Sequence, residues 1–275
     1  MATPRVGHMI LKPYEPDDAV ARLERKLAAS RSHERSEIER EIRIRRAGAK
    51  GEREASYFLD FDFGASSNHA VIHNLRLEYE GFTAQIDHLL INRFYGLTVL
   101  ETKYFSGGLK IEEDGSFHRY DEYDRCYVPI PSPVAQVERH VTLLSRLLRL
   151  TNQHLRRWGL GPRMEPIIES YVLVHTGSKI VRPAGFDTSR IMSSDRFAEH
   201  FNKRLDQKYG GIKSLLSLLL LFRILSRRRM LSFGMSLVEQ HKPLRPLVEI
   251  PVVSAKMPQP IATITGSNSS TVSKR

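Results

Sequence analysis

Two short apolar segments, joined by a turn, carry charged side chains. Residues 85–91 and 97–103 are rich in β-branched and aliphatic side chains, and the residues between them have the composition of a turn. Apolar runs of this length that are joined by a few turn residues predict a β-hairpin. With the turn centred on Phe94, Asp87 lies opposite Glu101 on the neighbouring strand.

Three charges meet in this hairpin. Glu101 and Lys103 are two positions apart on one strand, so their side chains project from the same face. Opposed Cβ atoms in an antiparallel pair lie about 4.5–5.5 Å apart, which brings Asp87 close to both. Like charges in opposed positions are destabilising, and buried carboxylates need a partner or a metal ion. The pattern therefore predicts a cation site, with a structural ion-pair cluster as the alternative.

The ligand types in this patch suit a hard divalent cation. Proteins hold Mg²⁺ through one or two carboxylates while several waters stay bound, and Mn²⁺ accepts the same ligands. Such an ion neutralises phosphate charge and produces hydroxide near neutral pH, as phosphodiester hydrolysis requires. Asp87 and Glu101 are the expected ligands, with the backbone carbonyl of Thr102 as a further one. Lys103 is expected to hold the phosphate or the attacking water.

The chain is strongly basic. Its 42 Lys and Arg residues outnumber 31 Asp and Glu among 275 residues, which gives a net charge of +11. Such an excess favours a polyanionic partner such as nucleic acid, although a basic surface also aids solubility. The single Cys126 excludes an internal disulfide and a Cys-based zinc cluster, and the N-terminus lacks the apolar core of a signal peptide. Both features predict a cytoplasmic protein.

Apolar periodicity and turn residues predict the remaining elements. Residues 17–47 are highly charged, with apolar positions at helical spacing, and predict one long helix or a helical hairpin. Gly48 and Gly51 are expected to interrupt it, and a second helix at 49–61 follows. Beyond them the pattern predicts strands at 70–79, 83–92, 96–103 and 167–174, a small hairpin within 105–133, and helices at 134–150, 194–209 and 212–226.

The C-terminal part is expected to be helical and then disordered. The apolar run 215–225 is shorter than the ~20 residues that span a bilayer and contains Arg223, so it predicts a buried helix and no membrane association. The three arginines that follow (227–229) are expected to mark the C-terminal end of this helix, where basic residues are favoured, or else to bind anionic lipid or nucleic acid. The C-terminal helices are also a candidate surface for a homo-oligomer or a partner protein. From residue 254 onward, Ser, Thr, Pro and Lys predict disorder.

Four ordered blocks of the sequence resemble the nuclease-related (NERD) domain, a branch of the PD-(D/E)xK nuclease superfamily. The blocks are Gly48-x-x-Gly51-Glu52, Gln85-Ile86-Asp87-His88, Glu101-Thr102-Lys103 and Ser132-Pro133-x-x-Gln136. The resemblance extends from about residue 48 to residue 175, with a weaker similarity up to Arg196.

The resemblance implies an α/β fold with a PD-(D/E)xK nuclease-like core, which is a mixed four-stranded sheet flanked by helices. The implied order is helix, three antiparallel strands, helix, strand. The sequence pattern adds an N-terminal charged helix and a C-terminal helical extension to this core. The expected division is a charged helical extension (1–47), a nuclease core (48–193), a helical region packed on or beside the core (194–253) and a disordered tail (254–275).

The same resemblance implies a catalytic site. By this similarity Asp87 and Glu101 are metal ligands, and Lys103 is the catalytic lysine. Glu52 is similar to a helix carboxylate that some members contribute, and Gln136 to a polar residue that the following helix points at the catalytic strands. Glu52 is alternatively a surface acid in a first helical turn, and Gln136 a capping residue.

Basic residues surround the helix that carries Glu52, namely Arg45, Arg46, Lys50 and Arg53. They are expected to contact phosphate groups, which positions nucleic acid without reading its sequence, or else to form a solvated helix face. Together these features predict a Mg²⁺-dependent nuclease that cleaves DNA with metal-activated water. The alternative is a non-catalytic module that binds nucleic acid with the same fold.

Overall fold

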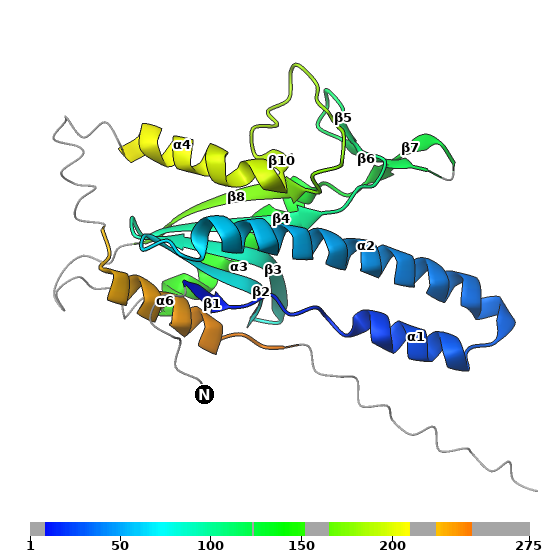
Figure 1. The fold of residues 1–275 in the computed structure, drawn as a ribbon, viewed down its shortest axis with the longest axis horizontal. Helices are drawn as coiled ribbons and strands as arrows, with labels where there is room; N and C mark the ends of the chain where they lie inside the picture. The colour runs from blue at the N-terminus through cyan, green and yellow to red at the C-terminus, as the bar shows by residue number, and fades with distance from the viewer. Residues whose placement is uncertain (1–8, 123, 152–164, 210–223, 244–275) are drawn as a thin grey trace, which may run out of the picture. The chain divides into compact units, whose positions relative to one another are not determined.

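Six strands form the central sheet, and helices cover both of its faces (Figure 1). The computed structural model describes residues 9–122, 124–151, 165–209 and 224–243. Strands β2, β3 and β4 are antiparallel, whereas β8 runs parallel to β4, so the sheet is mixed and the predicted α/β fold is confirmed. In spatial order the strands are β1 (Ile10–Lys12), β2 (His69–Tyr79), β3 (Phe82–Asn92), β4 (Gly96–Lys103), β8 (Ile167–Val174) and β10 (Ile191–Ser193).

The register of the β3–β4 hairpin agrees with the prediction. Asn92 pairs with Gly96, as a turn centred on Phe94 requires. The Asn92 side chain closes this turn, because its Oδ1 accepts hydrogen bonds from the amides of Phe94 and Gly96 at 3.0 and 3.1 Å. The ladder ends at the pair His88–Leu100, one pair short of the two carboxylates.

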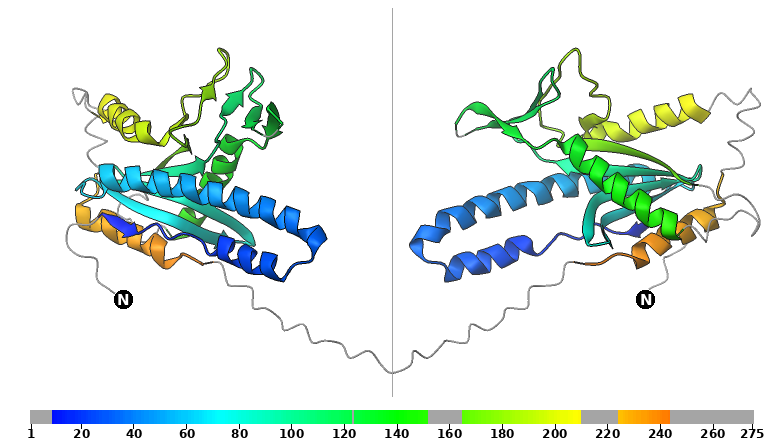
Figure 2. Two further views of the ribbon diagram at one scale, coloured as in Figure 1. Left: turned by 45° about the vertical axis from the view of Figure 1, so that its right-hand side comes forward. Right: turned by 180° about the vertical axis from the view of Figure 1, so that it is seen from behind.

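Helix α2 (Ser32–Phe63) is continuous, so the predicted break at Gly48 and Gly51 is wrong. Gly51 serves a contact rather than a turn, since a Cβ atom there would lie 3.2 Å from Cβ of Tyr104. The glycine therefore lets the helix approach the end of β4 closely. Helix α1 (Ala19–Ala29) lies alongside the N-terminal half of α2, as the helical-hairpin alternative predicts, and Figures 1 and 2 show this pair extending past the sheet.

Two apolar clusters hold helices on opposite faces of the sheet. One cluster joins α2 and α4 (Phe197–Tyr209) to the sheet, and the other joins α3 (Pro133–Thr151) and α6 (Arg227–Glu239), which Figure 2 shows from behind. Fully burying a large apolar side chain stabilises a fold by about 1.5–3 kcal/mol. The helical side chains that do so include Leu59, Phe63 and Phe201 on the first face, and Leu144, Met230 and Leu237 on the second.

A second sheet follows the end of β4. The sequence predicts only a small hairpin within 105–133, but that segment supplies three strands, and a fourth comes from beyond β8. Because β5 and β9 pair in parallel across a long stretch of chain, no local pattern reveals this sheet. Its strands, in the order β7-β6-β5-β9, are β7 (Cys126–Ile130), β6 (Phe117–Asp121), β5 (Leu109–Ile111) and β9 (Ile180–Val181).

The helix predicted at 194–209 is confirmed, as a 3-10 turn (Ser194–Arg196) that continues into α4. The proposed division at residue 47 falls inside α2, and the predicted disordered tail lies outside the described residues. The division into core and extensions therefore stays a prediction. In the part of the chain that the structure describes, every helix is too short or too polar to span a bilayer.

Helix α6 corrects the prediction for the C-terminal arginines. The helix expected at 212–226 lies mostly outside the described residues, and α6 begins directly after it. Ser226 is the N-cap of α6, because its Oγ accepts a hydrogen bond from the Arg229 amide at 3.3 Å. The three arginines thus lie in the first turn of a helix, and their predicted C-terminal position is wrong. The apolar face of α6 is used in the core, and a role in oligomerisation stays a prediction.

His69, at the start of β2, makes stability depend on pH. Its ring contacts those of Phe63 and Phe201 at centroid distances of 5.0 and 5.8 Å, and burial lowers its pKa from 6.5 to about 4. Between these two pH values the unfolded chain binds a proton that the folded protein does not, so stability is lost as the pH falls from 6.5 toward 4. We expect His69 to account for a loss of about 2 kcal/mol between pH 8 and pH 5.

The variant His69→Phe keeps an aromatic ring in this contact and removes the titrating group. Urea unfolding at pH 8 and pH 5 should therefore show a pH-dependent loss about 2 kcal/mol smaller in the variant than in the wild type. Equal losses in the two proteins would mean that His69 ionises in the folded state as it does in the unfolded chain.

Candidate active site

A local reversal in the β2–β3 hairpin opens the sheet beside Asp87. On β3, Ile86 and Leu89 both pack in the same apolar cluster, although strict alternation would place them on opposite faces. On β2, Asn74 has a φ of 49°, and the pairing register passes over it. Asparagine tolerates this left-handed conformation better than most residues do. The alternation of side chains between the two faces is therefore reset at Asn74 and Asp87.

Strand β3 separates from β4 at this reversal, and a side chain replaces the ladder. Oδ2 of Asp87 accepts a hydrogen bond from the backbone amide of Thr102 at 2.8 Å. The Asp87 carboxylate therefore stays next to β4, where it lines the same cavity as Glu101 and Lys103. The sequence predicts this proximity correctly, but through direct pairing rather than through a side-chain bond.

Lys103 is held by two side chains. Its Nζ donates hydrogen bonds to Oε1 of Glu101 at 2.7 Å and to Oε1 of Gln136 at 3.0 Å. Gln136 belongs to the first turn of α3, which begins at Pro133. Ser132 precedes this turn, and its Oγ accepts a hydrogen bond from the backbone amide of Ala135 at 3.1 Å. The start of α3 thus points Gln136 at the end of β4.

Three carboxylates share this region, and their charges oppose one another. Burial raises the pKa of Asp87 well above its ordinary value, and the charges of Glu101 and Glu52 raise it further. Burial also raises the pKa values of Glu101 and Glu52, while Lys103 acts in the opposite direction on both. Glu52 comes from α2 and accepts a hydrogen bond from Nδ2 of Asn74 at 3.4 Å. A divalent cation would relieve this repulsion.

All the residues predicted for the catalytic site line one cavity. The cavity has a volume of about 870 Å³ and is bounded by α2, β3 near Gln85 and Asp87, the end of β4, the start of α3 and the second sheet. Residues of the predicted site that line it are Glu52, Asp87, Glu101, Thr102, Lys103 and Gln136. The other lining residues include Arg40, Arg43, Ile44, Arg119, Tyr120 and His140.

His140 and Asn74, which lie beside the carboxylates, were not predicted as site residues. His140 follows Gln136 by one helical turn, so its position on the same face of α3 was readable from the sequence. Its Nδ1 lies 3.5 Å from Oε2 of Glu101, and burial, with the charges of Lys103 and Arg139, lowers its pKa to about 4. Asn74 gave no such signal, because its role depends on the reversal in β2 and β3.

The four residues predicted to contact phosphate do not line this cavity. Arg45 and Arg46 are exposed and form ion pairs with Glu41 and Glu24. Lys50 donates a hydrogen bond to the Tyr104 hydroxyl at 3.2 Å, and Arg53 is exposed. None of these four residues lines the cavity, whereas Arg40 and Arg43, further toward the start of α2, do.

The ligand set fits a hard divalent cation that keeps most of its water. Oε2 of Glu101 is buried and lacks a hydrogen-bond partner among the described residues, although Oε1 is bonded to Lys103. Asp87 offers a second buried carboxylate in the same cavity. Across the described ranges, no group of three or more His, Cys, Asp or Glu side chains is placed to hold a metal. Two carboxylates suffice for Mg²⁺, because waters complete its coordination.

The histidine next to Asp87 lies on the other face of the sheet. Nδ1 of His88 is 2.6 Å from Nδ1 of His73, and Nε2 of His73 is 2.9 Å from Oδ1 of Asp60 on α2. Both imidazoles are fully buried, and burial lowers the pKa of His88 well below its usual range. His88 is thus a neutral, buried ring that contributes to the contact between α2 and the sheet.

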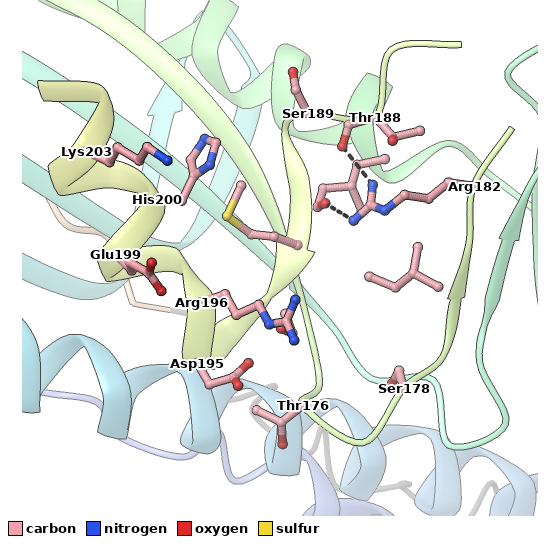
Figure 3. A pocket seen from close by; sticks show the side chains of 14 residues that line it. Thr176, Ser178, Arg182, Thr188, Ser189, Asp195, Arg196, Glu199, His200 and Lys203 are labelled. Carbon is pink, nitrogen blue, oxygen red and sulfur yellow. Dashed lines mark hydrogen bonds between the residues drawn. The ribbon is translucent and has the colours of Figure 1, made fainter. Parts of the chain in front are cut away.

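A second cavity, of about 750 Å³, lies between β9, β10 and α4. Figure 3 shows Arg196 extending into it, while Arg182 reaches in from the opposite wall and donates to the carbonyl oxygens of Thr188 and Ile191 at 2.9 and 2.6 Å. None of the predicted site residues lines this cavity. Its lining mixes both charge signs, with Asp195 and Glu199 beside Arg196 and Lys203.

Comparison with protein families agrees with this geometry. The family model described as nuclease-related domain (NERD) matches residues 47–175. This range includes α2 from its middle onward, β2 to β8 and all the cavity residues that were predicted for the catalytic site. Searches of curated proteins and of solved structures gave no significant match. Residues 47–175 of this chain are therefore a nuclease-related domain of the NERD family.

Proposed function

We propose that this domain is a metal-dependent nuclease that hydrolyses phosphodiester bonds of DNA with a core of the PD-(D/E)xK type. The observation that carries the proposal is the convergence of Asp87, Glu101 and Lys103 in one cavity. The chain order of α2, antiparallel β2 to β4, α3 and β8 supports the superfamily assignment. A cytoplasmic location is part of the proposal, and the exposed free thiol of Cys126 supports it.

The proposed roles follow from the contacts of each side chain. Asp87 and Glu101, with the Thr102 carbonyl, are the proposed ligands of Mg²⁺ or Mn²⁺. When bound, the ion supplies charge neutralisation on the phosphate and lowers the pKa of a water molecule. Lys103, aimed by Glu101 and Gln136, donates a hydrogen bond to the attacking water or to a phosphate oxygen. The water oxygen forms the new bond to phosphorus while the bridging P–O bond breaks.

The basic residues at the cavity support a nucleic-acid substrate. Arg40 and Arg43 line one wall of the cavity, and Arg119 and Tyr120 of the second sheet line it as well. Arginine donors suit phosphate groups, and a tyrosine ring at the wall of a cavity can stack on a base. The net charge of +11 also favours a nucleic-acid substrate, because it attracts a polyanion over longer distances.

Removal of Arg40 and Arg43 is expected to weaken binding to nucleic acid. The double variant Arg40→Ala/Arg43→Ala loses two proposed phosphate contacts, so the slope of log affinity against log salt should fall by about 2. Fluorescence anisotropy with a labelled oligonucleotide at several salt concentrations measures both quantities.

The matched control removes the same charge from the same helix. The variant Arg45→Ala/Arg46→Ala changes residues that pair with Glu41 and Glu24 outside the cavity, so its effect on the slope should be smaller. A larger change of slope in this control than in Arg40→Ala/Arg43→Ala would support Arg45 and Arg46 as the phosphate contacts. It would also place the nucleic acid on another face of α2.

The test of the proposed function is direct. Purified protein is incubated with labelled linear, circular and single-stranded DNA and with RNA, in Mg²⁺, in Mn²⁺ and in EDTA. Cleavage of DNA that requires a divalent ion supports the proposal, and cleavage of RNA alone corrects the substrate. Salt-sensitive binding without turnover under any metal condition would instead favour the non-catalytic nucleic-acid-binding module.

A further inference from the structure

The cavity contains a nitrogen and an oxygen atom that face each other without partners. Nδ1 of His140 lies 3.5 Å from Oε2 of Glu101, and in the described part of the chain neither atom has a hydrogen-bond partner. The two side chains are 13 % and 3 % exposed, so bulk water does not readily satisfy these atoms. A buried polar atom without a partner is unfavourable, and this pair therefore calls for a ligand.

The two oxygens of Glu101 have different surroundings. Oε1 accepts the hydrogen bond from Nζ of Lys103 at 2.7 Å, which leaves Oε2 as the atom directed toward α3. Helix α3 also supplies Gln136, which binds the same lysine at 3.0 Å. One helix face thus fixes the lysine through Gln136 and, one turn later, places His140 at the remaining oxygen of Glu101.

From this pair we infer that His140 is a metal ligand, and that the site binds first-row transition ions in preference to Mg²⁺. The inference rests on the proposed metal site and adds an imidazole nitrogen to its carboxylate ligands. Imidazole suits the later first-row ions, whereas Mg²⁺ prefers oxygen ligands alone. The nitrogen therefore changes which ion the site selects.

The separation of the two atoms allows both to bind one ion. Nitrogen and oxygen ligands about 2.1 Å from a metal lie about 3.0–3.4 Å apart, and the observed separation is 3.5 Å. Waters would complete the coordination, because no group of three or more His, Cys, Asp or Glu side chains in the described residues is placed to hold a metal.

Calorimetric titration of metal-free protein with Co²⁺ and with Mg²⁺ tests the inference without any activity assay. In His140→Gln, Co²⁺ affinity should fall at least about tenfold, while Mg²⁺ affinity changes less than about threefold. The matched control is His200→Gln, because His200 is another half-buried histidine but lines the second cavity. Its affinities for both ions should equal those of the wild type.

A measurement on the wild type guards against a variant that fails to fold. In histidine-labelled protein, ¹⁵N NMR should show the Nδ1 resonance of His140 shifting when Zn²⁺ is added, with His200 unaffected. An unshifted His140 resonance, or wild-type Co²⁺ affinity in folded His140→Gln, would overturn the inference. If His140 is excluded in this way but Glu101→Gln loses Co²⁺ affinity, the proposed nuclease site still stands without His140. Unchanged affinity in both variants removes the proposed metal site together with the inference.

Discussion

Replacement of Lys103 by methionine is expected to reduce cleavage about 10²–10⁴-fold while nucleic acid still binds. Methionine keeps most of the length of the side chain but removes the ammonium group that bonds to Glu101 and Gln136. The proposed role of that group is to hold the attacking water or the phosphate at the moment of reaction. Single-turnover cleavage rates, with binding measured in parallel by anisotropy, separate the two effects.

Lys110 offers a matched control for this variant. Like Lys103, it lies on a strand and pairs with a glutamate two positions away, because its Nζ is 2.7 Å from Oε1 of Glu112. It does not line the cavity, so Lys110→Met should cleave at the wild-type rate. Equal activity of Lys103→Met and Lys110→Met would remove Lys103 from the proposed mechanism.

Replacement of Asp87 by asparagine is expected to abolish metal-dependent cleavage and, at the same time, to stabilise the metal-free protein. Burial and the charges of Glu101 and Glu52 all raise the pKa of Asp87, so at neutral pH the ionised folded state is penalised relative to the unfolded chain. An asparagine oxygen still accepts the hydrogen bond from the Thr102 amide. We expect the free energy of unfolding to rise by about 0.5–2 kcal/mol, as when other destabilising active-site residues are replaced.

Thermal unfolding in EDTA and in excess Mg²⁺ measures this effect. In EDTA the midpoint of Asp87→Asn should exceed that of the wild type by about 1–8 °C, and Mg²⁺ should then stabilise only the wild type. An exposed acid such as Asp114 serves as the control, because Asp114→Asn changes the same charge without any contact to the cavity. A lower midpoint for Asp87→Asn in EDTA would contradict the account of mutual repulsion.

The hairpin that carries the site was predictable because its determinants are local. The bounds of β4 and the pairing of Asn92 with Gly96 follow from apolar runs and turn residues that are close in sequence. The same holds for α3, whose apolar positions recur with the helical period. The four motif blocks then identified the residues that the cavity brings together.

Other features depend on contacts that no local pattern contains. Glycine at position 51 indicates a break by propensity, yet it allows α2 to approach Tyr104 closely, a contact between distant segments. The reversal at Asn74 and Asp87 needs two strands to change together. The helical repeat of α2 decides which of its arginines face the cavity, and Arg40 and Arg43 do so. The prediction chose arginines close to Glu52 in sequence and did not consider which side of the helix they occupy.

A crystal structure of the protein soaked in Mn²⁺, with data collected for anomalous scattering, tests whether Asp87 and Glu101 hold a metal ion. We expect an anomalous peak within about 2.0–2.3 Å of one carboxylate oxygen from Asp87 and one from Glu101. A fully occupied Mn²⁺ ion elsewhere, with Asp87 and Glu101 contacting no metal, would contradict the proposed metal site.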